Sequence, residues 1–193
     1  MFNMHVDSWA LKAKKLGLRS RAVFKLEEIL KKTNALQGSE IILDIGSAPG
    51  GWSELVKNLS SSSKVFAIDL LDMAPIEGVN FFKDDVSNID NIKEISCLKS
   101  QFDLVISDLA PNLTGISTID EENIFELNIL TLLTARKYLK PDSGHFIIKT
   151  FQNGMLKKLK TEMEKRFKIV QTYKPAASKS KSSEIYLYGE SPL

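Results

Sequence analysis

Three short apolar runs, each ending near a carboxylate or a glycine, constrain the fold more than any other feature of this sequence. They are EIILDIG (40–46), KVFAIDL (64–70) and FDLVISD (102–108). Each is too short for a core helix and is rich in branched apolar residues, as are strands that are buried on both faces. Segments with helical apolar spacing lie between them, so the sequence predicts a mostly parallel sheet with helices on both faces.

The rest of the chain continues this alternation. Further strands are expected at 79–85, 144–151, 167–173 and 183–189, which makes seven, and helices at 7–15, 20–32, 51–59, 88–98, 120–139 and 154–166. The link between the last two strands contains Pro175 and lacks helical apolar spacing, so these two strands should pair antiparallel. No domain boundary is visible, and residues 1–193 are expected to form a single domain that includes the N-terminal helical segment, about 7–32.

Composition indicates a globular protein that does not enter a membrane. Hydrophobic residues make up 43% of the chain and charged residues 26%, and no apolar run reaches the roughly 20 residues of a membrane span. The single cysteine, Cys97, excludes an internal disulfide and fits a reducing compartment. We therefore expect a cytoplasmic protein, or an organellar one from which a transit peptide has been removed.

Charge is distributed unevenly, although the net charge is only +2. Residues 12–32 carry eight Lys/Arg against two Glu, residues 157–181 carry nine against two, and residues 40–142 carry seventeen Asp/Glu against eight Lys/Arg. Two basic ends around an acidic middle predict a face that binds a polyanion, and solvated helix faces are the alternative. The candidate contacts are Lys12, Lys14, Lys15, Arg19, Arg21, Lys179 and Lys181.

The first strand runs into a glycine-rich turn, LDIGSAPGGWSE (43–54), which contains Gly46, Gly50 and Gly51. Glycine lets the backbone turn sharply and approach a ligand closely, and ligands bind at the carboxyl ends of strands in open α/β sheets. The spacing is not that of the G-x-G-x-x-G motif, and a tight turn without a ligand is the alternative. We predict a cofactor site at this turn.

Two carboxylates are expected beside the turn. Asp69 ends the second strand, 23 residues after Gly46, where it can accept hydrogen bonds from a ribose diol, and the uncharged residues that follow disfavour a 2′-phosphate. Asp85, at the end of the third strand, can meet the amino group of a base or cap its loop. These features alone fit a nicotinamide dehydrogenase as well as a methyltransferase.

One charged residue favours the methyltransferase, and three others stand out from their surroundings. Asp108 ends the fourth strand in SDLAPN (107–112), where an acid can face both cofactor and substrate, and a dehydrogenase has no special need for it. Lys149 follows three apolar strand residues, so it must pair, reach solvent or lose its proton. Lys25 lies on an apolar helix face and Glu184 opens the last strand. Each of the last three could alone be a surface charge.

The chain resembles the FtsJ/RrmJ ribose 2′-O-methyltransferases in five ordered segments, which together span about residues 7–189. They are GLRSRAVFKLEEI, LDIGSAPGGWSE, SDLAPNLTG, IIKTFQ and SKSSEIYLYG. The resemblance implies a Rossmann-like S-adenosylmethionine-dependent methyltransferase fold and a catalytic tetrad at Lys25, Asp108, Lys149 and Glu184. It also implies cofactor contacts at Gly50, Gly51, Trp52, Asp69, Asp85 and Asp108, in addition to the contact expected at Gly46. Ser47 replaces an alanine of the family pattern, which is a small change.

This resemblance implies transfer of a methyl group to a ribose 2′-hydroxyl, with S-adenosylhomocysteine as the product. Two neighbouring lysines disfavour charge on each other, so one can release its proton near neutral pH and act as the base. We assign that role to Lys149, oriented by Asp108, while Lys25 and Glu184 hold the ribose. In the alternative, proton loss follows methyl transfer and the four residues mainly align the reactants. No metal is expected, because His5, His145 and Cys97 lack metal-ligand spacing.

Within the family, the compact chain and its last residues most resemble the bacterial and organellar enzymes of large-subunit rRNA. The implied partner is RNA within the large ribosomal subunit, the implied target is a uridine of the peptidyl-transferase A-loop, and we expect a monomer. Only RNA offers a 2′-hydroxyl as the acceptor. The alternatives are a tRNA methyltransferase, a non-catalytic RNA-binding ribosome assembly factor and, less favoured, a dehydrogenase.

Overall fold

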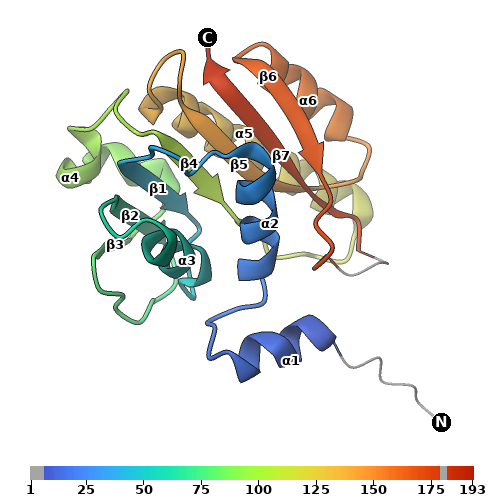
Figure 1. The fold of residues 1–193 in the computed structure, drawn as a ribbon. Coiled ribbons are helices and arrows are strands. Elements are labelled where there is room, and N and C mark those ends of the chain that lie inside the picture. Colours follow the sequence, from blue (N-terminus) through green and yellow to red (C-terminus); the bar gives the residue numbers. More distant parts are fainter. Residues whose placement is uncertain (1–6, 179–181) are drawn as a thin grey trace.

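A computed structural model describes residues 7–178 and 182–193. The described strands form a seven-stranded sheet in the order β3-β2-β1-β4-β5-β7-β6 (Figure 1). Pairs β3–β2, β2–β1, β1–β4 and β4–β5 are parallel, whereas β7 runs antiparallel to both of its neighbours, β5 and β6. The strands are β1 (Ile41–Ile45), β2 (Lys64–Asp69), β3 (Val79–Lys83), β4 (Leu104–Ser107), β5 (His145–Phe151), β6 (Phe167–Tyr173) and β7 (Glu184–Pro192). The predicted mixed sheet and the antiparallel final pair are confirmed.

Helices cover both faces of the sheet, as predicted (Figure 1). They are α1 (Ser8–Lys15), α2 (Val23–Thr33), α3 (Gly51–Leu59), α4 (Lys93–Ser96), α5 (Ser117–Tyr138) and α6 (Leu156–Glu164), with a 3-10 helix η1 (Val86–Asn91). The helix expected over 20–32 begins three residues later, at Val23.

The prediction of one helix over 88–98 is wrong, because η1 and the one-turn α4 occupy this segment. Short polar side chains here bond to nearby groups and compete with α-helical hydrogen bonds. Asp85 Oδ1 accepts a hydrogen bond from the backbone N–H of Ser87 at 2.8 Å, and Asp84 Oδ1 accepts one from Asn88 Nδ2 at 2.9 Å. These bonds favour a tighter turn at the start of the segment.

Alternate residues of the central strands point to opposite faces of the sheet and build two separate cores. In β1, Ile42 packs with α2 and α3, including Leu26 and Trp52, on one face. The adjacent Leu43 packs on the other face with α5 and α6, including Leu132. Each buried side chain of this size contributes about 1.5–3 kcal/mol through removal from water. The two cores fix the carboxyl ends of β1, β2 and β4 at one edge.

Helix α1 packs at one end of the molecule against a small third cluster (Figure 1). In this cluster, Ala13 of α1 and Phe24 of α2 pack with Ala177, which follows β6. The basic segments from the two ends of the sequence are thereby brought together. Among the residues described, no helix is both long and apolar enough to cross a membrane.

Candidate active site

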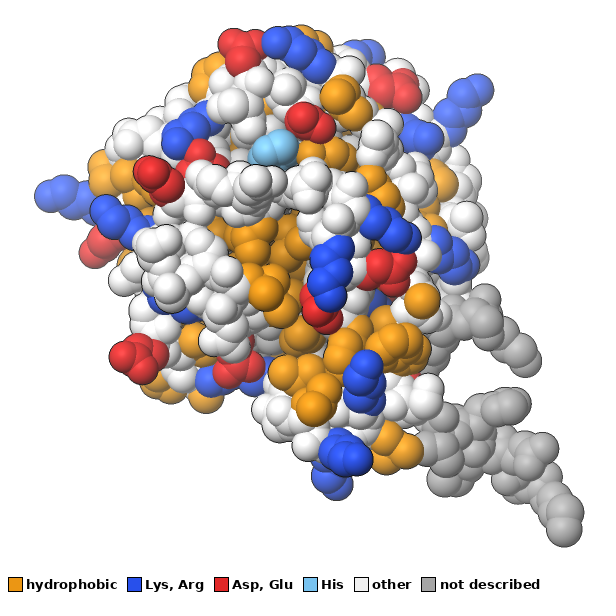
Figure 2. Space-filling model, viewed as in Figure 1, with side chains coloured by type: hydrophobic (Ala, Val, Ile, Leu, Met, Phe, Trp, Pro, Cys, Tyr) orange, Lys and Arg blue, Asp and Glu red, His pale blue; other side chains and the backbone are white. Residues whose placement is uncertain are grey.

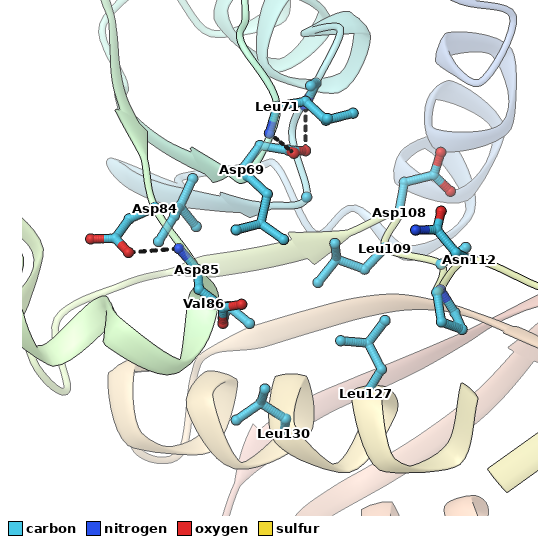
Figure 3. Close-up of a pocket in the computed structure, with 16 residues that line it drawn as sticks. Asp69, Leu71, Asp84, Asp85, Val86, Asp108, Leu109, Asn112, Leu127 and Leu130 are labelled. Atoms are coloured by element: carbon cyan, nitrogen blue, oxygen red, sulfur yellow. Dashed lines mark hydrogen bonds between the residues drawn. The ribbon is translucent and has the colours of Figure 1, made fainter. Parts of the chain in front are cut away.

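A cavity of about 540 Å³ opens at the carboxyl ends of β1, β2 and β4 (Figure 3). Its wall combines carboxylates with apolar side chains, among them Asp69, Asp85, Asp108, Leu109, Leu127 and Leu130. Gly46 and Ala48 of the predicted turn also line it. The cavity therefore lies where the sequence predicted a cofactor.

Gly46 is held in a conformation that favours glycine, with φ of +77°. A Cβ added at this position would lie 2.4 Å from Cγ of Leu109, which lines the cavity. The turn also contributes two hydrogen bonds, since the N–H groups of Gly46 and Ser47 donate to the carbonyl of Ile68 at 2.8 and 3.2 Å. A side chain at position 46 would strain the turn and displace the cavity wall.

Asp69 is oriented by backbone N–H groups of two loops, the glycine turn and the loop that follows β2. Its Oδ2 accepts from the N–H of Ala48 at 2.9 Å and its Oδ1 from the N–H of Leu71 at 2.8 Å (Figure 3). Asp85 lines the same cavity and also caps η1, so the capping role considered for it is confirmed. The hydrogen bonds from Ser87 lower the pKa of Asp85, which keeps it ionised at neutral pH.

Three of the predicted cofactor residues do not line the cavity, namely Gly50, Gly51 and Trp52. A Cβ on Gly50 would lie 2.7 Å from Ile76, and one on Gly51 would lie 2.6 Å from Ser20 Oγ. Trp52 is buried, donates from Nε1 to the carbonyl of Ala22 at 2.9 Å and packs against the ring of Tyr186. These residues let α3 and the N-terminal segment pack closely.

The predicted tetrad is assembled beside the cavity from four elements as two ion pairs. Lys25 Nζ in α2 lies 2.5 Å from Glu184 Oε1 at the start of β7. Lys149 Nζ in β5 lies 3.2 Å from Asp108 Oδ1 after β4, and it also donates to the backbone carbonyl of Asp108. The tertiary structure thus brings together side chains separated by as many as 159 positions.

Tyr186 joins the two ion pairs, and the sequence analysis missed it. Its hydroxyl lies 3.2 Å from both Asp108 Oδ1 and Glu184 Oε1. Tyr186 stands two residues after Glu184, and strand periodicity places such residues on the same face. That spacing was the signal in the sequence that could have identified it. In the sheet, Tyr186 is also directly opposite Lys149.

Burial and charge act in opposite directions on the two tetrad carboxylates. Burial raises the pKa of Asp108, and the positive charges of Lys149 and Lys25 only partly offset this effect. For Glu184, burial also acts to raise the pKa, but the hydrogen bond and charge of Lys25 prevail and lower it. Burial and the adjacent carboxylates raise the pKa of Tyr186, so its hydroxyl stays protonated and available as a donor.

A further buried carboxylate, Asp44, lies under the turn and was not singled out from the sequence. It is fully buried in β1, and its Oδ2 accepts from Ser53 Oγ at 2.7 Å. Burial, together with the charges of Asp108 and Asp69, raises the pKa of Asp44 to about 7. Among the described residues, its Oδ1 has no hydrogen-bond partner.

The predicted polyanion contacts are only partly gathered on one surface. Lys12, Lys14 and Lys15 lie on the exposed side of α1, and Lys and Arg side chains project there at the lower edge of the molecule (Figure 2). Lys12 Nζ stands 4.9 Å from the ring centre of Phe24. Arg21 pairs with Asp7 at 2.9 Å. Arg19 instead bonds to groups within the fold, and Lys179 and Lys181 lie outside the described residues.

Comparison with known proteins identifies the family. The model of the FtsJ-like methyltransferase family matches residues 18–191. The chain belongs to this family. The resemblance predicted from the five sequence segments is therefore confirmed, and membership implies S-adenosylmethionine as the methyl donor.

Relatives of the chain carry consistent names. It is 41% identical to a ribosomal RNA large subunit methyltransferase E from Chromobacterium violaceum, covering 95% of this chain and 91% of that one. It is 39% identical to a protein of the same name from Methanocella arvoryzae, covering 95% and 72%. A crystal structure of a putative ribosomal RNA methyltransferase from Plasmodium falciparum superposes with a TM-score of 0.79 at 32% identity, covering 91% of this chain and 98% of that one.

More distant structures support the fold alone. Human methyltransferase-like protein 13 in complex with SAH has a TM-score of 0.57 at 14% identity, covering 88% of this chain and 78% of that one. The chain therefore has the Rossmann-like fold of S-adenosylmethionine-dependent methyltransferases, as predicted.

Proposed function

We propose that this FtsJ-like methyltransferase transfers a methyl group from S-adenosylmethionine to the 2′-hydroxyl of a uridine in large-subunit rRNA. The observation that carries this proposal is the pair of lysine–carboxylate contacts, linked by Tyr186, at the edge of the cavity. The names of the relatives support the choice of rRNA.

The residues around the cavity fit S-adenosylmethionine, which supplies an activated methyl group when it is bound. Asp69 would accept hydrogen bonds from the ribose hydroxyls and Asp85 from the amino group of adenine. Leu109, Leu127 and Leu130 provide apolar contacts for the base. We expect Gly46 to admit the cofactor, while Gly50, Gly51 and Trp52 support the turn through packing.

The chemistry of the tetrad is proton removal and alignment. In its neutral form, Lys149 would accept the proton of the 2′-hydroxyl as the methyl group passes from the sulfonium sulfur to the 2′-oxygen, which would leave S-adenosylhomocysteine. Asp108 holds both the lysine and the hydroxyl, while Lys25 and Glu184 position the ribose. Because all four side chains come from one chain, we propose that the enzyme acts as a monomer and that residues 1–193 work as a single domain.

RNA binding is assigned to the basic ends. Lys12, Lys14 and Lys15 would contact phosphates, together with Lys179 and Lys181 outside the described residues. The contact between α1 and the segment after β6 supports a shared RNA face. We place the protein with its rRNA substrate, in the cytoplasm or in an organelle, and we expect no metal requirement.

The test is to map 2′-O-methyl groups across rRNA and tRNA in cells with the protein, without it, and with its Lys149→Ala variant. We expect one uridine of large-subunit rRNA to lose its methyl group in the last two strains. Loss at a tRNA position would instead support the tRNA enzyme. Normal ribosome assembly with Lys149→Ala, together with full methylation, would support a non-catalytic assembly factor.

A further inference from the structure

Arg19 uses its guanidinium to tie three segments together. Nε donates to Glu54 Oε1 in α3 at 3.3 Å, and Nη1 donates to the carbonyls of Pro49 at 3.3 Å and Ala74 at 3.0 Å. Nη2 donates to the carbonyl of Pro75 at 3.0 Å. The side chain is 22% exposed, so most of it is turned toward the fold.

Two of these segments shape the cofactor cavity. Pro49 belongs to the glycine turn, while Ala74 and Pro75 belong to the 70–78 loop between β2 and β3. The start of this loop, Leu70 and Leu71, lines the cavity directly after Asp69. The bonds of Arg19 therefore hold one wall of the cavity against another.

The aliphatic part of Arg19 supports the same arrangement. A Cβ on Gly50 would lie 3.3 Å from Cδ of Arg19 and 2.9 Å from the sulfur of Met73, in the 70–78 loop. Gly50 has φ of +100°. The turn, the arginine stem and the loop thus meet at a position where no side chain fits.

Arginine suits this place better than lysine does. Its planar guanidinium presents five donors in fixed directions and can bond to several separated acceptors at once. All donors of a lysine ammonium lie on one nitrogen, so it cannot span the same acceptors. Three of the four bonds end on carbonyls of turn and loop residues, which offer no charge of their own. The four bonds use four of the five donors, so a phosphate could accept only from the remaining N–H of Nη2 unless one of these bonds were broken.

We propose that Arg19 is a positioning residue for the cofactor cavity: it holds the 70–78 loop against the glycine turn, and cofactor affinity, not RNA affinity, depends on it. The inference rests on the proposed use of the cavity for S-adenosylmethionine. It corrects the expectation that Arg19 contacts RNA phosphate.

The test compares Arg19→Lys and Arg19→Gln with the matched pair Arg21→Lys and Arg21→Gln in the full chain. Arg21 stands two positions further on, is 26% exposed and pairs with Asp7 instead of the cavity segments. Calorimetry would measure S-adenosylmethionine binding, and salt titrations would measure RNA binding. We expect Arg19→Gln to weaken cofactor binding about tenfold or more, Arg19→Lys to do so by less, and the Arg21 variants to stay within about twofold.

Steady-state kinetics separate positioning from general damage to the fold. Arg19→Lys should raise the KM for S-adenosylmethionine and leave kcat near that of the wild type at saturating cofactor. Should Arg19→Gln fail to fold, Glu54→Ala removes one hydrogen-bond partner of Arg19 without altering a basic residue, and it should raise the same KM.

Two results would overturn the inference. The first is that the Arg19 variants keep their cofactor affinity but bind RNA more weakly, with a salt slope reduced by about one unit. Arg19 would then contact RNA phosphate. A wild-type chain that does not bind S-adenosylmethionine would overturn the proposed function together with this inference. If the wild-type chain bound S-adenosylmethionine but did not methylate rRNA, only the proposed function would be wrong. The inference about Arg19 would still be tested by cofactor affinity.

Discussion

Lys149 and Asp108 are joined twice, through the carboxylate at 3.2 Å from Nζ and through the backbone carbonyl. In the neutral form that a base requires, the amine has two N–H donors and one lone pair, so these two bonds leave the lone pair for the proton of a substrate hydroxyl. The lysine is thereby fixed at the carboxyl end of β4, beside the cavity. This geometry makes Lys149 the residue whose replacement is most informative.

Lys149→Arg replaces the amine that we propose as the base with a guanidinium, which stays positively charged and cannot accept the proton. We expect the variant to bind cofactor and RNA and to lose two to four orders of magnitude in rate, and Lys149→Ala to be equally inactive. Single-turnover transfer of labelled methyl to an rRNA fragment, followed from about pH 6 to 10, provides the measurement. Wild-type rates should rise with pH and then level off. An arginine variant that is nearly as fast as the wild type would show that Lys149 supplies only charge.

Tyr186→Phe tests the hydroxyl that connects the two ion pairs. Its loss removes a donor from Asp108 and Glu184, so the rate should fall about tenfold while cofactor binding is kept. Tyr188→Phe is the matched control, because that hydroxyl contacts His145 and Glu190 further along the same strand. Equal rates for the two variants would show that the Tyr186 hydroxyl has no specific role in methyl transfer.

Gly46→Ala should weaken S-adenosylmethionine binding at least tenfold, since it adds a Cβ 2.4 Å from the Leu109 side chain. Gly38→Ala is a control for backbone strain. Gly38 has the same φ of +77°, but its added Cβ would have no neighbour within 4 Å. Calorimetry on both variants checks the prediction, and a similar loss of affinity in both would assign the effect to strain alone.

RNA affinity should depend strongly on salt. If about four basic side chains neutralise duplex phosphates, log K should fall against log salt with a slope of roughly −3 to −4. Lys14→Glu with Lys15→Glu should make the slope shallower by about two and leave cofactor binding intact. Lys64→Glu with Lys93→Glu, outside the basic ends, is the charge-matched control. The proposed RNA face would be wrong if both pairs changed the slope equally.

Asp44 should make folding stability depend on pH. With its pKa raised from 3.8 to about 7, the folded chain keeps this proton where the unfolded chain has lost it. Its contribution to the free energy of unfolding therefore falls as pH rises from about 4 to 7, then stays constant. Relative to Asp44→Asn, which does not titrate, wild-type stability should drop by on the order of 4 kcal/mol over that range. Urea unfolding of both proteins at several pH values measures this difference, and a flat difference would contradict it.

The sequence predicted the features that depend on local pattern. The apolar runs gave the strands, and the carboxylates that end them, Asp69 and Asp108, do line one cavity. The tetrad came from the family resemblance, and the structure brings its members together.

The missed features depend on contacts between distant parts of the chain. Sequence pattern could not show that Arg19 turns toward Ala74 and Pro75, because a basic residue in a basic segment is usually solvated. Nor could it show that Trp52 packs on Tyr186 and away from the cavity. The 3-10 helix η1 reflects competition by the side chains of Asp84 and Asp85, which apolar spacing does not record.

The place of β7 between β5 and β6 has a consequence for the order in which the enzyme is made. This last strand carries Glu184 and Tyr186, and it must enter between two strands that are synthesised before it. Lys25 therefore emerges during translation without its partner Glu184, and the pair of Asp108 and Lys149 emerges without the hydroxyl of Tyr186. The proposed catalytic centre is complete only when β7 joins the sheet, so we expect a growing chain to lack methyltransferase activity until this strand is available.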